Sequence, residues 1–274
     1  LLIACQIPDR FLFFIFIIIY QKEEETLSKK QRNIIALTSA MALTFGLASN
    51  VGAMHIMEGY LPGGYCIGWG ILCLPFLAAG FMSINKKLKE HRNLITLLAM
   101  SGAFVFVISS LKIPSVTGSC SHMTGTGLGA ILFGPSAVSI LGLIVLVFQA
   151  ILLAHGGLTT IGANTFSMAI AGPFVSYGIW VICKKANINK KVAVFLAATL
   201  GDLFTYCVTA VQMAMAHHAD TTIGAAMGKF LLVFAPTQVP LAIIEGIITV
   251  LIVMGLETYA KPELRSIGFL KEAK

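Results

Sequence analysis

Charged residues are scarce in this sequence. Only 11% of its 274 residues are charged, whereas 57% are hydrophobic and the mean hydropathy is +0.88. Soluble globular domains carry about 25% charged residues, so the composition argues against a soluble domain. The net charge of +7 does not indicate a nucleic-acid partner, because the basic residues stand in short clusters between apolar runs.

Several motifs that carry chemistry are also missing. The six cysteines form no CxxC pair, which argues against a disulfide scaffold and a zinc site. There is no GxxxxGK[ST] phosphate loop, so ATP hydrolysis would have to reside on another chain. No HExxH motif occurs. An intramembrane metallohydrolase would need such a motif and a base beside an open metal position, so the sequence argues against this class of enzyme.

Long apolar runs, in contrast, recur along almost the whole chain. A membrane-spanning helix needs about 20 mainly apolar residues. We therefore predict an all-α integral membrane protein with about seven transmembrane helices. The third run is short and ends at Gly134–Pro135, so its depth in the membrane stays open. The runs after residue 53 lie at about 65–84, 94–112, 126–134, 136–155, 165–183, 191–216 and 229–256.

The basic residues predict an orientation. Lys and Arg gather in three groups, at 86–92, 184–191 and 261–274, which the positive-inside rule places in the cytoplasm. From an outside amino terminus, residues 113–164 must then cross the membrane an even number of times, as two passes or one re-entrant excursion. Two passes give seven spans, with the amino terminus outside and the carboxyl terminus cytoplasmic.

Residues 27–53 have the layout of a cleavable signal peptide. Basic residues precede an apolar stretch, and Val51 and Ala53 stand at the −3 and −1 positions of a small-residue cleavage site. An uncleaved signal anchor is the alternative. Cleavage would leave 54–274 as the transmembrane domain and would place the new amino terminus outside the cytoplasm.

Residues 1–26 are predicted to be an over-extended reading frame. The sequence opens with Leu1, and no methionine precedes Met41. Its first apolar run, 11–20, is too short to span a membrane. We expect translation to begin near Leu27.

The residues after the predicted cleavage site form a candidate metal chelate. The free amine of Met54, the amide nitrogen of His55 and the His55 imidazole can bind one cation through five- and six-membered rings. Three nitrogens in a plane favour Ni(II) or Cu(II), and also permit Co(II). Without cleavage there is no terminal amine, and His55 would be a polar residue near a membrane surface.

A Gly-rich outside loop at 112–129 holds the second candidate ligand. Irregular backbone survives near a membrane only where it lines a site or packs inside protein. His122 could supply the fourth nitrogen, with a purely structural histidine as the alternative. Ser119, Ser121 and Thr124 are predicted to hold its other ring nitrogen, which is the usual arrangement around a metal-binding histidine.

Four further polar residues have predicted roles. Glu58 could orient the terminal amine or His55 as a hydrogen-bond acceptor. His155 could line the access path of the metal or shape the loop that supports the ligand histidine. Asp202 and Glu245 lie inside apolar runs, where a carboxylate usually faces the bundle interior with a partner, so we favour a structural hydrogen-bond network over a metal role.

Three long motifs carry a resemblance to a known family. They are MHIMEGYLP at 54–62, SCSHMTGTGLGAILFGP at 119–135 and HGGLTTIGANTFSM at 155–168. The chain resembles the CbiM family over essentially all of 54–256. Members of that family are the substrate-capture (S) components of energy-coupling-factor (ECF) cobalt transporters, and the nickel component NikM is similar in plan.

The resemblance implies a seven-helix bundle in a bacterial or archaeal cell membrane, with the metal held by Met54, His55 and His122. It implies Co(2+) as the transported substrate, with Ni(2+) as the alternative, and no organic cofactor. The implied partners are a transmembrane scaffold (T) subunit, two ATPase subunits and, in some forms, a small accessory membrane subunit; the implied role is cobalt supply for cobalamin synthesis. Met123 stands where the family form has Pro, a change that concerns loop stiffness more than ligand identity.

Overall fold

The computed structural model describes one compact unit of the chain. The predicted reading-frame extension at 1–26 and the predicted signal peptide at 27–53 lie outside the described residues, as do Met54 and Ser119. The structure describes residues 55–111, 113–114, 120–218 and 221–270.

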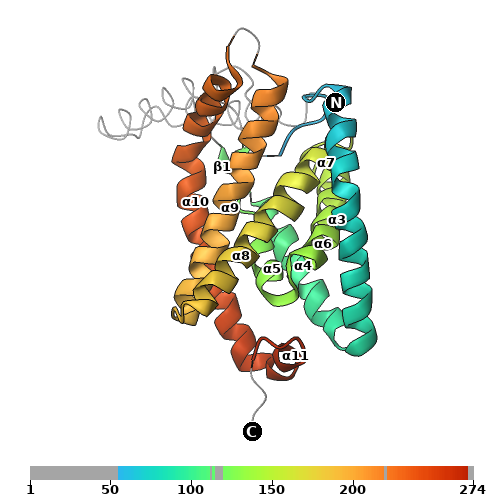
Figure 1. Cartoon of the computed structure of the whole chain (residues 1–274), viewed down its shortest axis with the longest axis vertical. Helices are drawn as coiled ribbons and strands as arrows, with labels where there is room; N and C mark the ends of the chain where they lie inside the picture. The colour runs from blue at the N-terminus through green and yellow to red at the C-terminus, as the bar shows by residue number, and fades with distance from the viewer. Residues whose placement is uncertain (1–54, 112, 115–119, 219–220, 271–274) are drawn as a thin grey trace, which may run out of the picture. The chain divides into compact units, whose positions relative to one another are not determined.

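Helices make up nearly all of the described structure (Figure 1). A two-stranded antiparallel hairpin pairs Ile113 with Ser121 and Pro114 with Cys120. The elements in chain order are α3 (Gly63–Glu90), α4 (Leu94–Ser110), β1 (Ile113–Pro114), β2 (Cys120–Ser121), α5 (Thr126–Phe133), α6 (Pro135–Leu152), α7 (Ile161–Asn164), the π-helix η1 (Thr165–Ala171), α8 (Gly172–Lys185), α9 (Lys190–Ala216), α10 (Ile223–Tyr259) and α11 (Lys261–Ser266).

Among the described residues, five helical segments are long and apolar enough to cross a membrane: α3, α6, the continuous segment 161–185, α9 and α10. The apolar helix α4 is slightly shorter, with 17 residues. Large apolar side chains stay exposed along these helices, Leu232 at 76% and Ile67 at 66% among them, as expected where lipid is the solvent. The prediction of an α-helical integral membrane protein is confirmed.

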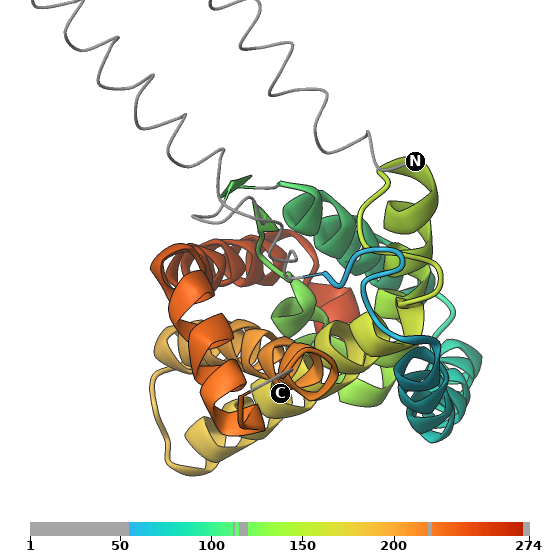
Figure 2. The ribbon, with the colours of Figure 1, turned by 90° about the horizontal axis from the view of Figure 1, so that it is seen from above.

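The short third apolar run forms α5, a helix of eight residues that are all buried. Eight helical residues rise only about 12 Å, less than half of a bilayer core. The helix packs against α4, α6, α8, α9 and α10, so it lies inside the bundle, as the view in Figure 2 shows. Because α5 faces protein and not lipid, it does not need the length of a membrane-spanning helix. It ends at Gly134, whose φ of +84° suits glycine, and Pro135 begins α6.

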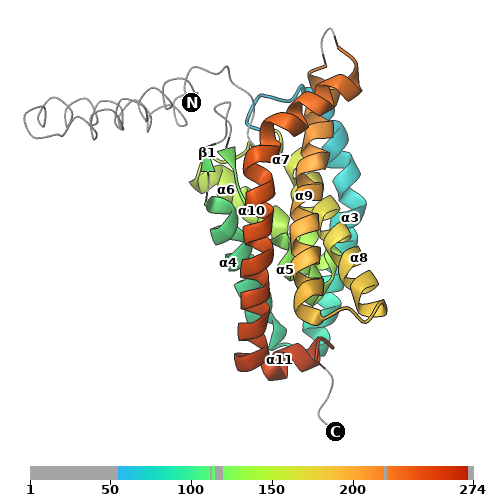
Figure 3. The same ribbon diagram turned by 90° about the vertical axis from the view of Figure 1, so that its left-hand side faces the viewer.

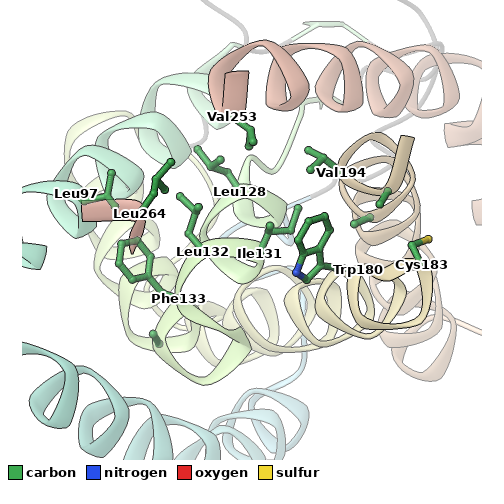
Figure 4. Packing of buried hydrophobic residues seen from close by; sticks show 13 residues of the cluster. Leu97, Leu128, Ile131, Leu132, Phe133, Trp180, Cys183, Val194, Val253 and Leu264 are labelled. Atoms are coloured by element: carbon green, nitrogen blue, oxygen red, sulfur yellow. The ribbon is translucent and has the colours of Figure 1, made fainter. Parts of the chain in front are cut away.

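The main hydrophobic core surrounds α5 (Figure 4). Its side chains meet residues from α4, α8, α9, α10 and α11. Glycine allows α9 to approach its neighbours closely: a Cβ at Gly201 would lie 1.8 Å from Oγ of Ser176, and one at Gly246 would lie 2.2 Å from Oγ1 of Thr199. The labelled core residues are Leu97, Leu128, Ile131, Leu132, Phe133, Trp180, Cys183, Val194, Val253 and Leu264.

Helices α9 and α10, which both contribute to this core, begin at capped residues. The side chain of Asn189 accepts a hydrogen bond at the start of α9, and that of Thr222 does so at the start of α10. Two prolines, Pro236 and Pro240, interrupt the backbone hydrogen bonding inside α10. Figure 3 shows β1 and α7 at one end of the bundle and α11 at the other, with α10 running between the two ends.

Candidate metal centre

Three histidines from distant parts of the sequence converge at the β1 and α7 end of the bundle. His55 precedes α3, His122 follows β2, and His155 follows α6. One ligand nitrogen from each lies within 4.8 Å of the others. The three side chains are only 2%, 0% and 2% exposed, respectively. Imidazole nitrogens gathered in this way are a donor set for zinc, copper, cobalt or nickel.

The hydrogen bonds define which nitrogens face the centre. Nδ1 of His122 lies 2.9 Å from the carbonyl oxygen of Met123, and a carbonyl can only accept, so this nitrogen carries the hydrogen. In the neutral imidazole, Nε2 of His122 then presents its lone pair to Nδ1 of His55, which donates to it. A cation between the two rings would take the place of that proton. Nδ1 of His55 is also the nitrogen that closes a six-membered ring with its own backbone amide.

The backbone after His55 is clamped by two side chains, one just before α7 and one at its last residue. The N–H of Ile56 donates to Oδ1 of Asn164 at 2.8 Å, and the carbonyl of Ile56 accepts from Nδ2 of Asn164 at 3.1 Å and from the Thr160 hydroxyl at 2.7 Å. Ile56 itself is fully buried. In Figure 2 this segment, in blue, runs from α3 across the end of the bundle toward its middle.

His155 joins the cluster through a tight turn. Its ring centroid lies 4.5 Å from that of His55 and 4.9 Å from that of His122. The turn includes Ala154 at φ +47°, a left-handed conformation that costs a non-glycine residue about 1 kcal/mol. Gly156 follows at φ +78°, and a Cβ there would lie 3.1 Å from Nδ2 of Asn164. The turn therefore places the His155 ring in contact with the other two rings. The sequence predicted a place on the access path or a role in shaping the loop, and did not predict this contact.

Glu58 ties the same segment to the loop before α7. It accepts hydrogen bonds from the backbone N–H of Thr159 at 3.2 Å and from the Thr159 hydroxyl. The hydroxyl bond lowers the pKa of Glu58 below its ordinary value, against a smaller opposing effect of burial. This carboxylate thus bonds to the loop at Leu158 and Thr159. It was predicted to orient the terminal amine or His55, and the amine lies outside the described residues.

Ser121 and Thr124 hold the loop backbone and its packing. The Ser121 hydroxyl is 2.7 Å from that of Thr237 on α10. Thr124 donates to Glu245 through its backbone N–H at 2.6 Å and its hydroxyl at 3.0 Å. The ring nitrogen predicted to meet these hydroxyls meets the backbone carbonyl of Met123 instead. Successive side chains of extended chain point in opposite directions, which directs Ser121 away from its neighbouring ring.

Sequence reasoning gave Thr160 and Asn164 no role in holding the ligand segment. A signal was present, because the two polar residues are four positions apart and therefore share a face of a helix. Their partner is the backbone of Ile56, about a hundred positions earlier in the chain, so the local sequence pattern could not reveal it.

The family described as "Cobalt uptake substrate-specific transmembrane region", CbiM, matches residues 55–264. The chain belongs to the CbiM family. The cobalt transport protein CbiM of Lachnoclostridium phytofermentans is 68% identical over 245 residues, which cover 89% of this chain and 98% of that protein. CbiM of Chlorobium limicola is 56% identical over 232 residues, covering 84% of this chain and 91% of that protein.

A solved structure resembles this CbiM family member as well. The crystal structure of a truncated transition metal transporter superposes with a TM-score of 0.67 at 28% sequence identity, covering 75% of this chain and 99% of that one. All three histidines lie inside the region that matches CbiM. The chain is therefore a multi-pass cell-membrane protein and a membrane component of cobalt uptake.

Proposed function

We propose that the chain is the substrate-binding subunit of an ATP-driven ECF-type importer that supplies cobalt for cobalamin biosynthesis. The observation that carries this proposal is the convergence of His55, His122 and His155 in a buried cluster. Nickel capture by the same class of transporter is the alternative, because both ions accept the same nitrogen donors. The protein would capture and release the ion without catalysis of its own.

The donor set suits a borderline transition metal. Cleavage after Ala53 would free the Met54 amine. The donor set would then be this amine, the His55 amide nitrogen, Nδ1 of His55 and Nε2 of His122. His155 supplies a further nitrogen beside this set. Metal binding requires neutral imidazoles, so capture should release protons and weaken as the pH falls.

Basic residues support the predicted orientation. The α3–α4 turn, the α8–α9 turn and α11 lie at one end of the bundle (Figure 1), and these elements carry the three basic groups of the sequence. The histidine cluster lies near the opposite end, which the positive-inside rule makes the outside. This arrangement favours an outside amino terminus, a cytoplasmic carboxyl terminus and the seven-span count, with α4 and α5 as its two short members.

Other features support a transporter over a metallohydrolase. Among the described residues, the cluster of possible metal ligands holds three histidines and no carboxylate that could act as a base beside the metal. The sequence lacks a phosphate loop, so energy would come from two ATPase subunits coupled through a transmembrane scaffold subunit. Exposed apolar helix faces leave room for such a scaffold within the membrane.

The test begins with protein purified from membranes. Intact mass and amino-terminal sequencing should find a chain that starts at Met54. Calorimetric titration with Co(2+) and Ni(2+) should then find about one tightly bound ion per chain. A chain that starts upstream of Met54 would remove the amine from the site, and a chain that binds neither ion would end the proposal.

A further inference from the structure

The backbone that follows His122 is held from α10 at two points. Nε2 of Gln238 donates to the His122 carbonyl at 3.2 Å. Beyond Met123, the Glu245 carboxylate accepts from the backbone N–H of Thr124 at 2.6 Å. Residues 121–125 are buried and not helical, so their polar groups need partners from elsewhere in the bundle. Two α10 side chains thus satisfy the backbone carbonyl and the N–H that flank Met123, directly after the ligand histidine.

A carboxylate on α9 fixes the orientation of the glutamine. Nε2 of Gln238 also donates to Oδ2 of Asp202, at 2.6 Å. The amide nitrogen has two hydrogens, and this pair of bonds uses one for each acceptor. Asp202 therefore keeps the nitrogen of Gln238, and not its oxygen, toward the carbonyl of His122.

Packing alone does not account for these side chains. Asp202, Gln238 and Glu245 are at most 1% exposed, and neither carboxylate forms an ion pair with a described Lys or Arg residue. Carboxylates at membrane depth are costly, and an apolar side chain of similar size would fill the same space at lower cost. What an apolar side chain could not do is hold the polar backbone that follows His122.

Resting on the proposed function, we infer that Asp202, Gln238 and Glu245 are positioning residues of the metal centre. They hold the backbone of the loop so that Nε2 of His122 faces His55 before a cation arrives. Because Asp202 belongs to α9 and the other two to α10, the position of this ligand depends on the packing of those two helices. Pro236 and Pro240 flank Gln238 and weaken the backbone hydrogen bonding of α10 at that level.

The decisive variant is Gln238→Glu in the full-length protein. The change keeps the size of the side chain but replaces its donor nitrogen by an acceptor, which then faces the His122 carbonyl and Asp202. Loss of a partner that orients a ligand typically weakens metal binding 10- to 100-fold, so we expect the Kd for Co(2+) or Ni(2+) to rise about tenfold or more. At saturating metal, the absorption bands of the bound ion should match those of the unchanged protein, because the same nitrogens still bind.

Further variants distinguish a positioning role of these side chains from a purely structural one. Asp202→Asn keeps an acceptor for Gln238 and should stay within about threefold of the unchanged affinity, whereas Asp202→Leu should weaken binding as Gln238→Glu does. Thr249→Val is the matched control, because Thr249 is fully buried on α10, one turn beyond Glu245, and has no described hydrogen bond to the loop. It should leave the affinity unchanged.

The inference is overturned if Gln238→Glu folds and binds with unchanged affinity, or if it lowers only the melting temperature of the metal-free protein. Should that variant fail to fold, Asp202→Leu decides: it removes the acceptor that orients Gln238, and an unchanged affinity contradicts the inference. His55→Ala separates the two proposals. If it abolishes binding while the α10 variants do not weaken it, only the inference fails; if the unchanged protein binds neither ion, both proposals fail.

Discussion

Nδ1 of His122 lies 2.9 Å from the carbonyl oxygen of Met123, the next residue in the chain. This local contact selects the ring nitrogen that faces the centre, and it depends on the backbone alone. Every residue type, proline included, offers such a carbonyl, so the tautomer on which the site depends does not require the Met123 side chain.

Removing the His122 imidazole should abolish tight metal binding. His122→Ala deletes the nitrogen that meets Nδ1 of His55, and we expect the Kd for Co(2+) to rise by more than the roughly 100-fold that loss of a merely orienting group costs. Calorimetric titration measures it. His91→Ala is the control, because this exposed histidine follows α3 at the far end of the bundle. Equal affinities in the two variants would contradict the site.

The clamp on Ile56 should matter in proportion to its hydrogen bonds. Asn164→Ala removes partners from both the N–H and the carbonyl of that buried residue, whereas Thr160→Val removes one of the two partners of the carbonyl. We expect about a tenfold or greater loss of metal affinity in the first variant and a smaller loss in the second. Titration of both variants checks the order, and the reverse order would show that the clamp does not position His55.

Gly162 should not tolerate a side chain. A Cβ there would lie 2.6 Å from the backbone nitrogen of Gly70 on α3, and backbone cannot move aside as a flexible side chain can. Gly162→Ala should cost about 1–3 kcal/mol of stability, measured by thermal unfolding. Gly70→Ala is a matched control from the same contact, because a Cβ on that residue meets nothing within 4 Å. Similar melting temperatures for the two variants would contradict the packing of α7 on α3.

The Glu58 contact should stabilise the metal-free protein only above acidic pH. Hydrogen bonding from Thr159 lowers the pKa of Glu58, so its contribution is present above the ordinary value of 4.5 and is lost as the pH falls through the lowered one. Glu58→Gln should therefore melt at a lower temperature than the unchanged protein at pH 7, with the difference shrinking below about pH 4. A difference that stays constant with pH would indicate that the charge of Glu58 has no part in the contact.

Hydropathy was enough to predict most of the fold. The apolar runs gave the helices because lipid leaves the chain no other way to satisfy its backbone. Hydropathy could not place α5, because a helix that is apolar on all sides has the same hydropathy whether it faces lipid or protein. Its central position follows from contacts with five other helices, which the local sequence does not record.

Only part of the metal site could be predicted, again because the local sequence does not record contacts between distant segments. His55 and His122 stood out because each lies in a short polar interruption of an apolar sequence, and their rings are in contact in the structure. The place of His155 in the cluster depends on a backbone turn with Ala154 at positive φ, for which alanine is no signal. The partners of Thr124 lie more than a hundred positions away, so spacing could not reveal them.

Burial of all three imidazoles separates the speed of metal capture from its strength. The rings of His122 and His155 both pack against that of His55, and none of the three residues is more than 2% exposed. A cation from water therefore reaches the nitrogens only when part of the surrounding structure opens, and the clamp on Ile56 is a contact that opposes movement of the His55 segment. The frequency of that opening limits the association rate constant, whereas the nitrogens chiefly govern dissociation. Variants of the clamp and variants of the ligands should therefore alter different rate constants.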